Sequence, residues 1–147
     1  MEKKEQYRLL ERQLAALLEG ETDLIAKMAN LAAVLHESFG FWWTGFYRVA
    51  GEELILGPFQ GPVACMHIPC GNGVCGTAWA RNETVVVPDV EAVPGHIACS
   101  SASRSEIVVP VHVPDGTVTA VLDIDSDKLA TFDETDKEWL EKIVRLL

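Results

Sequence analysis

The sequence has few basic residues. Lys and Arg together number 12 against 22 Asp and Glu, which gives a formal net charge of −10. A general nucleic-acid-binding protein needs a positively charged surface to meet the phosphates. This balance therefore argues against nucleic acid as a partner. An acidic surface serves solubility, and an acidic pocket would favour the ammonium group of a ligand.

Long apolar runs are also missing. No segment approaches the roughly 20 apolar residues that a membrane-spanning helix needs. The charged N-terminal stretch MEKKEQYRLLERQ lacks the apolar core of a signal peptide. We therefore expect a soluble, cytoplasmic protein with no membrane partner. The chain has 147 residues, 48% of them hydrophobic, which is enough for one domain with a core of its own.

The close cysteine pairs of a structural zinc site are absent as well. Such pairs are usually separated by roughly two to four residues, whereas Cys65, Cys70 and Cys75 follow one another at intervals of five. Zinc is therefore a weak alternative, and we expect no metal and no other cofactor. In a cytoplasmic chain, catalytic or structural thiols explain the cysteines better than the disulfides of a secreted protein.

The hydrophobic pattern predicts an α+β fold. Two helices at the N-terminus are separated at Gly20, and the second ends at Gly40. A short helix follows the glycine turn in GNGVCGTAW, and the C-terminal helix is capped by Thr131 or Asp133. About six strands are expected, at residues 41–50, 52–59, 62–69, 84–90, 105–114 and 115–126.

Two predicted hairpins set the architecture. One turns at Ala50–Gly51 and the other at Asp115–Gly116. Hairpins argue for a central antiparallel sheet, with the N- and C-terminal helices packed on one face. The loops and the short helix would cover the opposite face, and a ligand pocket would form between them and the sheet.

Three acidic residues are predicted to meet on this sheet. Asp123 and Asp125 share one face of their strand because side chains alternate. Counting from the Asp115–Gly116 turn brings Glu106 of the partner strand close to Asp125. A solvent-facing strand would show the same pattern. In a pocket, however, the three acids would repel one another unless one kept a proton or a cation lay among them, which is a functional-site signature.

An aromatic strand, FWWTGFY, adds a second candidate feature. Trp43 and Tyr47 share one of its faces with Phe41, while Trp42 and Phe46 lie on the other. Most such side chains belong to the core. If Trp43 and Tyr47 instead face the pocket, they form a wall suited to a methyl group or a cation. The pattern leaves open which face is which.

Of the four cysteines, Cys99 fits the description of a buried structural thiol worst. It lies in VPGHIACSSASRSE, close to His96 and among residues that are typical of a surface loop. An exposed thiol in a reducing compartment is best explained by a chemical function. It needs a second thiol to return from an oxidised state, and three candidates exist. Cys65, on the strand predicted at 62–69, best fits a buried structural thiol.

These pieces together resemble a known family. WWTGFY, GVCGTAW, HIACSS and VLDIDS, in a stretch from about Phe41 to the C-terminal helix, are similar to the free methionine-(R)-sulfoxide reductases, which are stand-alone proteins of the GAF fold. The resemblance implies a single GAF domain over residues 1–147. It also implies reduction of free L-methionine (R)-S-oxide to L-methionine, with electrons from thioredoxin or another dithiol.

The resemblance also implies residue roles. Cys99 matches the cysteine that attacks sulfur, Cys65 the resolving cysteine, and Cys75 a third family cysteine that is an alternative disulfide partner. Glu106 and Asp125 match acids near the sulfoxide oxygen, with Asp123 beside them. The substrate-binding wall is implied to hold Trp43, Tyr47 and Ile97. Cys70 departs from the family pattern, which leaves the disulfide connectivity open.

A competing class is a GAF module that senses a small ligand without catalysis. A sensor would usually be joined to an output domain and would not need aligned cysteines and acids. The two terminal helices would support a homodimer.

Overall fold

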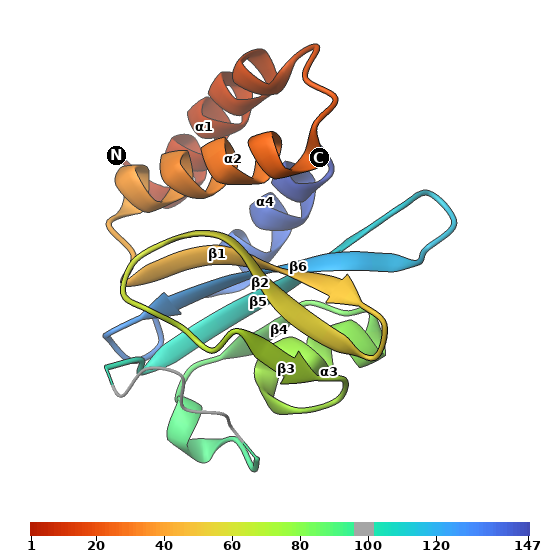
Figure 1. Cartoon of the computed structure of the whole chain (residues 1–147). Helices are drawn as coiled ribbons and strands as arrows, with labels where there is room; N and C mark the ends of the chain where they lie inside the picture. The colour runs from red at the N-terminus through yellow and green to blue at the C-terminus, as the bar shows by residue number, and fades with distance from the viewer. Residues whose placement is uncertain (96–101) are drawn as a thin grey trace.

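The structure is a computed structural model that describes residues 1–95 and 102–147. Helices flank an antiparallel sheet (Figure 1). In chain order, the elements are α1 (Lys3–Leu18), α2 (Leu24–Phe39), β1 (Trp43–Ala50), β2 (Glu53–Gln60), β3 (His67–Pro69), α3 (Gly73–Arg81), β4 (Val85–Val87), the 3₁₀ helix η1 (Val90–Ala92), β5 (Ser105–His112), β6 (Val118–Ser126) and α4 (Glu134–Val144).

The six strands form one sheet in the order β3-β2-β1-β6-β5-β4, and every neighbouring pair is antiparallel. The predicted antiparallel sheet is therefore confirmed. Both hairpins turn where the sequence predicts: Gly51 has a φ of 66° and Gly116 a φ of 93°, which glycine adopts without steric cost. The Thr117 backbone N–H donates to Asp115 Oδ1 at 2.8 Å and tightens the second turn.

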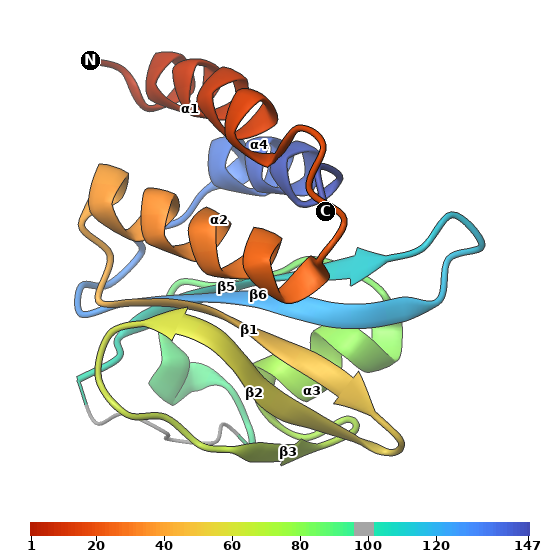
Figure 2. The ribbon, with the colours of Figure 1, turned by 45° about the horizontal axis from the view of Figure 1, so that its top comes forward.

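The helices α1, α2 and α4 lie on one face of the sheet, as expected (Figure 2). α2 and α4 rest on the strands, and α1 lies on their outer side. Leu14, Leu31 and Leu140 are fully buried in the core between them. At its other end, α1 is tied to α4 because the Tyr7 hydroxyl donates to Asp136 Oδ1 at 2.5 Å.

The helix ends follow local rules. Asp23 caps α2 by accepting from the Ala26 N–H, and Gly40 ends it in the left-handed conformation. Of the two candidates for capping the C-terminal helix, Asp133 does so, in a capping box with Asp136.

The opposite face carries α3, η1 and the loop that precedes β3. The strand predicted at 62–69 is much shorter than expected, since only His67–Pro69 pairs with β2. Earlier residues turn carbonyls to aromatic side chains instead: Trp43 Nε1 donates to Pro62 O at 3.0 Å, and the Tyr47 hydroxyl donates to Cys65 O at 2.8 Å. Cys65 therefore lies in a half-buried loop, and its placement on a strand was wrong.

Among the described residues, no helix combines the length and the apolar character that crossing a bilayer demands.

Candidate functional site

A pocket lies between the sheet and the elements that cover its second face. β1 contributes two aromatic residues, β5 and β6 contribute three acids, and α3 and the loop before β3 close the other sides. It is lined by Trp43, Tyr47, Val63, Ala64, Ile68, Asn72, Gly73, Val74, Cys75, Ser103, Glu106, Asp123 and Asp125. The ligand pocket predicted on this face therefore exists.

The acids meet because of strand register. Glu106 pairs with Asp125 across β5 and β6, as counting from the turn predicts, and Val108 pairs with Asp123. Side chains two residues apart share a face, so Asp123 and Asp125 both face the pocket with Glu106. Glu106 is only 5% exposed and Asp123 only 6%. The solvent-facing alternative for this strand is therefore wrong.

Burial of these carboxyls changes their protonation. Burial raises the pKa of Glu106 to about 8, and the charge of Asp125 adds to the effect. Burial and then the charge of Asp123 raise the pKa of Asp125 well above its usual range. The cluster therefore retains at least one proton at neutral pH, as expected for acids that share a site.

Ser103 is a member of this cluster that sequence reasoning missed. Its hydroxyl donates to Asp125 Oδ1 at 3.2 Å, and its side chain is buried. It belongs to the serine-rich stretch before β5, which reads as loop. Only the pairing of β5 with β6, which brings Ser103 beside Asp125, could have distinguished it from its neighbours.

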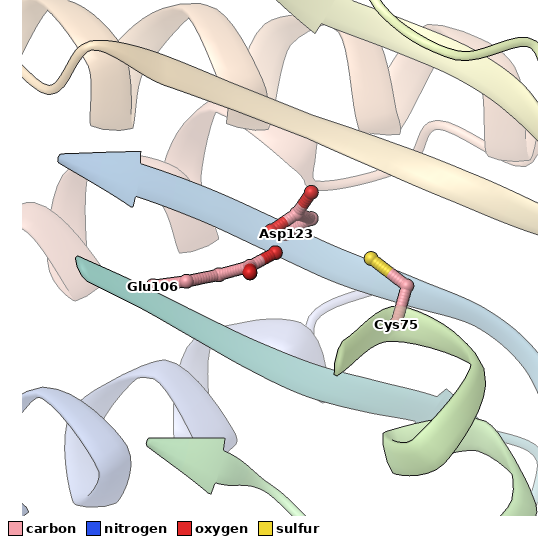
Figure 3. A group of neighbouring side chains, drawn as sticks. All are labelled: Cys75, Glu106 and Asp123. Carbon is pink, nitrogen blue, oxygen red and sulfur yellow. The ribbon is translucent and has the colours of Figure 1, made fainter. Parts of the chain in front are cut away.

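Cys75 enters the same site from the first turn of α3. Figure 3 shows its sulfur pointing toward Glu106 of β5 and Asp123 of β6, and one donor atom from each lies within 4.8 Å of the other two. Burial and then the charge of Asp123 raise the pKa of the Cys75 thiol well above its usual value. A thiol that stays protonated is a weak nucleophile.

The same three donor atoms are close enough to share a metal ion. Metal ligands must first lose their protons, and burial favours the protonated forms of both Cys75 and Glu106. In these protonated forms, Cys75 and Glu106 offer hydrogen-bond donors to the pocket.

The structure shows which face of the aromatic strand β1 lines the pocket, which the sequence left open. Trp43 and Tyr47 face the pocket, whereas Phe46 is buried in the core beneath the helices. Trp43 stacks between Tyr47 and Phe59, at centroid distances of 5.9 and 5.3 Å. Gly45 makes room for this stack, since a Cβ there would lie 2.7 Å from Trp43 Cη2.

The start of α3 offers hydrogen-bond donors to the pocket. Asn72, Gly73 and Val74 line it, and the Asn72 side chain makes no capping hydrogen bond. The first N–H groups of a helix have no partner within the helix, and with the helix dipole they favour an anion.

The cysteines differ in state. Cys65 is disulfide-bonded. Cys70 is an exposed free thiol and Cys75 a buried one. The predicted nucleophile Cys99, the predicted contact Ile97 and the neighbouring His96 all lie outside the described residues.

Comparisons with known proteins agree with this geometry. Residues 19–147 match a family model described as GAF domain. The chain is 56% identical over 146 residues to GAF domain-containing protein A of Dictyostelium discoideum, which covers 99% of this chain and 92% of that one. It is 46% identical to the free methionine-R-sulfoxide reductase of Escherichia coli K12 over 148 residues, which covers 100% of this chain and 89% of that one.

A solved structure is also similar throughout. The X-ray structure of free methionine-R-sulfoxide reductase from Neisseria meningitidis in complex with its substrate has a TM-score of 0.97 and 53% identity. The match covers 99% of this chain and 88% of that one.

Proposed function

We propose, from the premise that this chain belongs to the free methionine-R-sulfoxide reductases of the GAF domain family, that it reduces free L-methionine (R)-S-oxide to L-methionine. The observation that carries the proposal is one pocket in which a buried acid cluster faces an aromatic wall. Glu106 and Asp125 supply acid and charge, and Trp43 supplies the indole face.

In the proposed reaction, the Cys99 thiolate attacks the sulfoxide sulfur. An S–S bond forms as the S–O bond breaks, and the departing oxygen takes up two protons and leaves as water, so the step needs an acid within the pocket. A water molecule then adds to the Cys99 sulfur and breaks the S–S bond, and one proton is released. Methionine leaves as the thioether, reduced by two electrons, and Cys99 is left oxidised by two electrons as a sulfenic acid.

Glu106 is the proposed proton donor. Its pKa of about 8 leaves it protonated at neutral pH, where an exposed glutamate would be ionised. The substrate sulfur gains positive character as the S–O bond breaks. A neighbouring carboxylate on Asp125 and the face of Trp43 would stabilise that charge.

The pocket also suits the two charged ends of a free amino acid. None of its described lining residues is Lys, Arg or His. We therefore assign the substrate carboxylate to the N–H groups at the start of α3, near Gly73 and Val74. The ammonium group would lie near the acids. A peptide-bound sulfoxide lacks both charged groups.

Cys65 is the proposed resolving thiol. It condenses with the Cys99 sulfenic acid to form a disulfide and water, and an external dithiol such as thioredoxin returns both to thiols. Support comes from Cys65 being disulfide-bonded while Cys70 and Cys75 are free. The high pKa of the Cys75 thiol also makes Cys75 a slow attacking group.

The remaining expectations stay predictions. A single domain over residues 1–147 is supported by the contacts of α1 with α4, since Lys3 Nζ lies 2.8 Å from Asp136 Oδ2. Thioredoxin as the reductant, the cytoplasmic location, a homodimer and the lack of a cofactor are predicted from the sequence and the family resemblance.

The deciding experiment measures dithiol-dependent reduction of free L-methionine (R)-S-oxide, with the (S) form and a peptide-bound sulfoxide alongside. The wild type is compared with Cys99→Ser, and Cys70→Ser serves as the control for loss of an exposed thiol. We expect turnover of the free (R) form alone, lost only in Cys99→Ser. If the folded, reduced wild type turned over no sulfoxide, a ligand-sensing GAF module would replace the enzyme.

A further inference from the structure

Ser103 links the segment that carries the predicted nucleophile to the acid cluster. It comes two residues after that segment, 96–101, and two residues before β5 begins at Ser105. The backbone beside it is fixed, because the Arg104 N–H donates to Ser126 O at 2.7 Å and extends the pairing with β6. The Ser103 side chain is 8% exposed and lines the pocket.

The Ser103 hydroxyl has a defined target. It donates to Asp125 Oδ1 at 3.2 Å. A hydroxyl that donates to a carboxyl favours its ionised form, because a carboxylate accepts hydrogen bonds more strongly than a neutral acid does.

We infer that Ser103 is a positioning residue that keeps Asp125 as the ionised member of the acid cluster and thereby leaves the shared proton on Glu106. The inference rests on the proposed function for its catalytic consequence, but the hydrogen bond and its effect on Asp125 stand without it. The chemistry needs this division, because one acid must donate a proton while another keeps a negative charge.

Few groups around Asp125 can keep its carboxyl ionised. Glu106 faces it from β5, Asp123 from its own strand, Tyr47 from β1 and Cys75 from α3. Each of these four groups is either neutral or negative. Among the described lining residues, no cationic side chain distinguishes Asp125 from Glu106. Hydrogen bonds from Ser103 and then from Glu106 lower the pKa of Asp125, against the stronger effects of burial and the charge of Asp123, which raise it. Of these two donors, only Ser103 carries a proton that does not itself titrate near neutral pH.

The test follows the two carboxyl groups directly. The side-chain carboxyl carbons of Asp125 and Glu106 are titrated by ¹³C NMR in wild type, Ser103→Ala, Ser103→Thr and Ser105→Ala. Ser105 is a matched control, since it is fully buried nearby but donates to the backbone carbonyl of Lys128 at 2.6 Å instead of a carboxyl. The pH profile of kcat/KM is measured on the same proteins.

In Ser103→Ala, we expect the lower-pH titration of the pair to move up by on the order of one pH unit. The upper titration should stay near its wild-type position, because Asp125 is ionised on both sides of that step. The acidic limb of kcat/KM should move with the NMR titration. Ser103→Thr should restore both, and Ser105→Ala should move neither.

The inference fails if the Asp125 carboxyl titrates alike in wild type and Ser103→Ala, or if Ser105→Ala shifts it equally. If the titration moves as expected while no sulfoxide is reduced, the positioning role stands and the proposed reaction is wrong. The two failures are therefore distinguishable.

Discussion

Glu106 is a buried acid whose protonation differs from that of an exposed glutamate. Its carboxyl lies in a buried pocket beside two further acids, and its pKa of about 8 is set first by burial. An exposed glutamate would be ionised at that pH. The same burial that keeps Glu106 protonated at neutral pH must also make its ionisation costly for the folded state.

This cost predicts how stability depends on pH. The folded pKa of about 8 lies above the ordinary value of 4.5, so the folded chain binds the proton more tightly than the unfolded chain does. The contribution of Glu106 is fully present below pH 4.5 and declines until pH 8. Urea unfolding at pH 5 and at pH 8 should show wild type losing a few kcal/mol more than Glu106→Gln. Equal losses would contradict the buried, protonated carboxyl.

The pH dependence of catalysis should reflect the titration of Glu106. We expect kcat/KM of the wild type to fall as the pH rises through about 8, where Glu106 loses its proton. Glu106→Gln cannot donate a proton and should lose activity by a factor of about 10² to 10⁴. Asp115→Asn, at the exposed hairpin turn, is the matched control and should keep wild-type activity. A Gln variant that retained the wild-type rate and pH profile would exclude Glu106 as the acid.

Single-turnover chemistry separates the proposed roles of the cysteines. Without a dithiol, Cys65→Ser should still release one methionine per chain, because the Cys99 sulfenic acid forms before the resolving step. With thioredoxin, its steady-state rate should fall at least about tenfold, whereas Cys70→Ser should not change. Product measured by rapid quench tests this. A normal steady-state rate in Cys65→Ser would assign the resolving step elsewhere.

At the scale of elements, strand β1 decides the shape of the pocket. Its register against β2 shifts between Gly45 and Tyr47, and the missing side chain of Gly45 lets Trp43 stack on Phe59. A Cβ at Gly45 would lie 2.4 Å from Phe59 Cβ and 3.0 Å from Phe59 Cα, so side-chain rotation alone cannot relieve the contact.

Gly45→Ala should therefore disturb the aromatic wall. We expect a loss of about 1–3 kcal/mol in the free energy of unfolding and a higher KM for the sulfoxide. Gly57→Ala is the control on β2, because its Cβ would meet Phe46 O at 3.1 Å and the flexible Arg48 side chain at 3.4 Å. Steady-state kinetics and urea titration compare them. An unchanged KM in Gly45→Ala would remove the wall from substrate binding.

Local signals explain how far the sequence could predict these elements. The β5–β6 hairpin has its turn at Asp115–Gly116, so counting residues placed Glu106 opposite Asp125 correctly. The strand predicted at 62–69 was too long, because carbonyls at its start accept hydrogen bonds from the side chains of Trp43 and Tyr47. The alternation of apolar and polar residues carries no information about such contacts. Ser103 was missed for the same reason, since its target lies 22 residues further along the chain.

On the scale of the whole molecule, the sheet separates two cores. One lies under the helices and contains Leu14, Phe46 and Ile124, and the other surrounds the pocket and contains Trp43 and Val108. The buried contact of Tyr7 with Asp136 belongs to the first core alone. Stability and pocket chemistry should therefore respond to different substitutions.

Tyr7→Phe tests this separation. It removes a donor from the buried Asp136 carboxyl and should cost about 1–3 kcal/mol of unfolding free energy, while kcat/KM stays at the wild-type value. Arg8→Ala removes only an exposed ion pair with Glu5 and should change stability by less than about 1 kcal/mol. Urea titration and kinetics measure both. A large change in kcat/KM for Tyr7→Phe would show that the two cores are coupled.

Trp43 and Tyr47 belong to two structures at once. Each forms part of the pocket wall, and each also holds a carbonyl of the loop that contains Cys65, through Pro62 O and Cys65 O. Burial, together with the charge of Asp123, raises the pKa of Tyr47, so its hydroxyl keeps the proton that it donates. In the proposed disulfide exchange, any shift of that loop would therefore move the wall that we propose to bind the substrate. The fluorescence of Trp43 should therefore report both on the position of the loop and on occupancy of the pocket, because its indole contacts both.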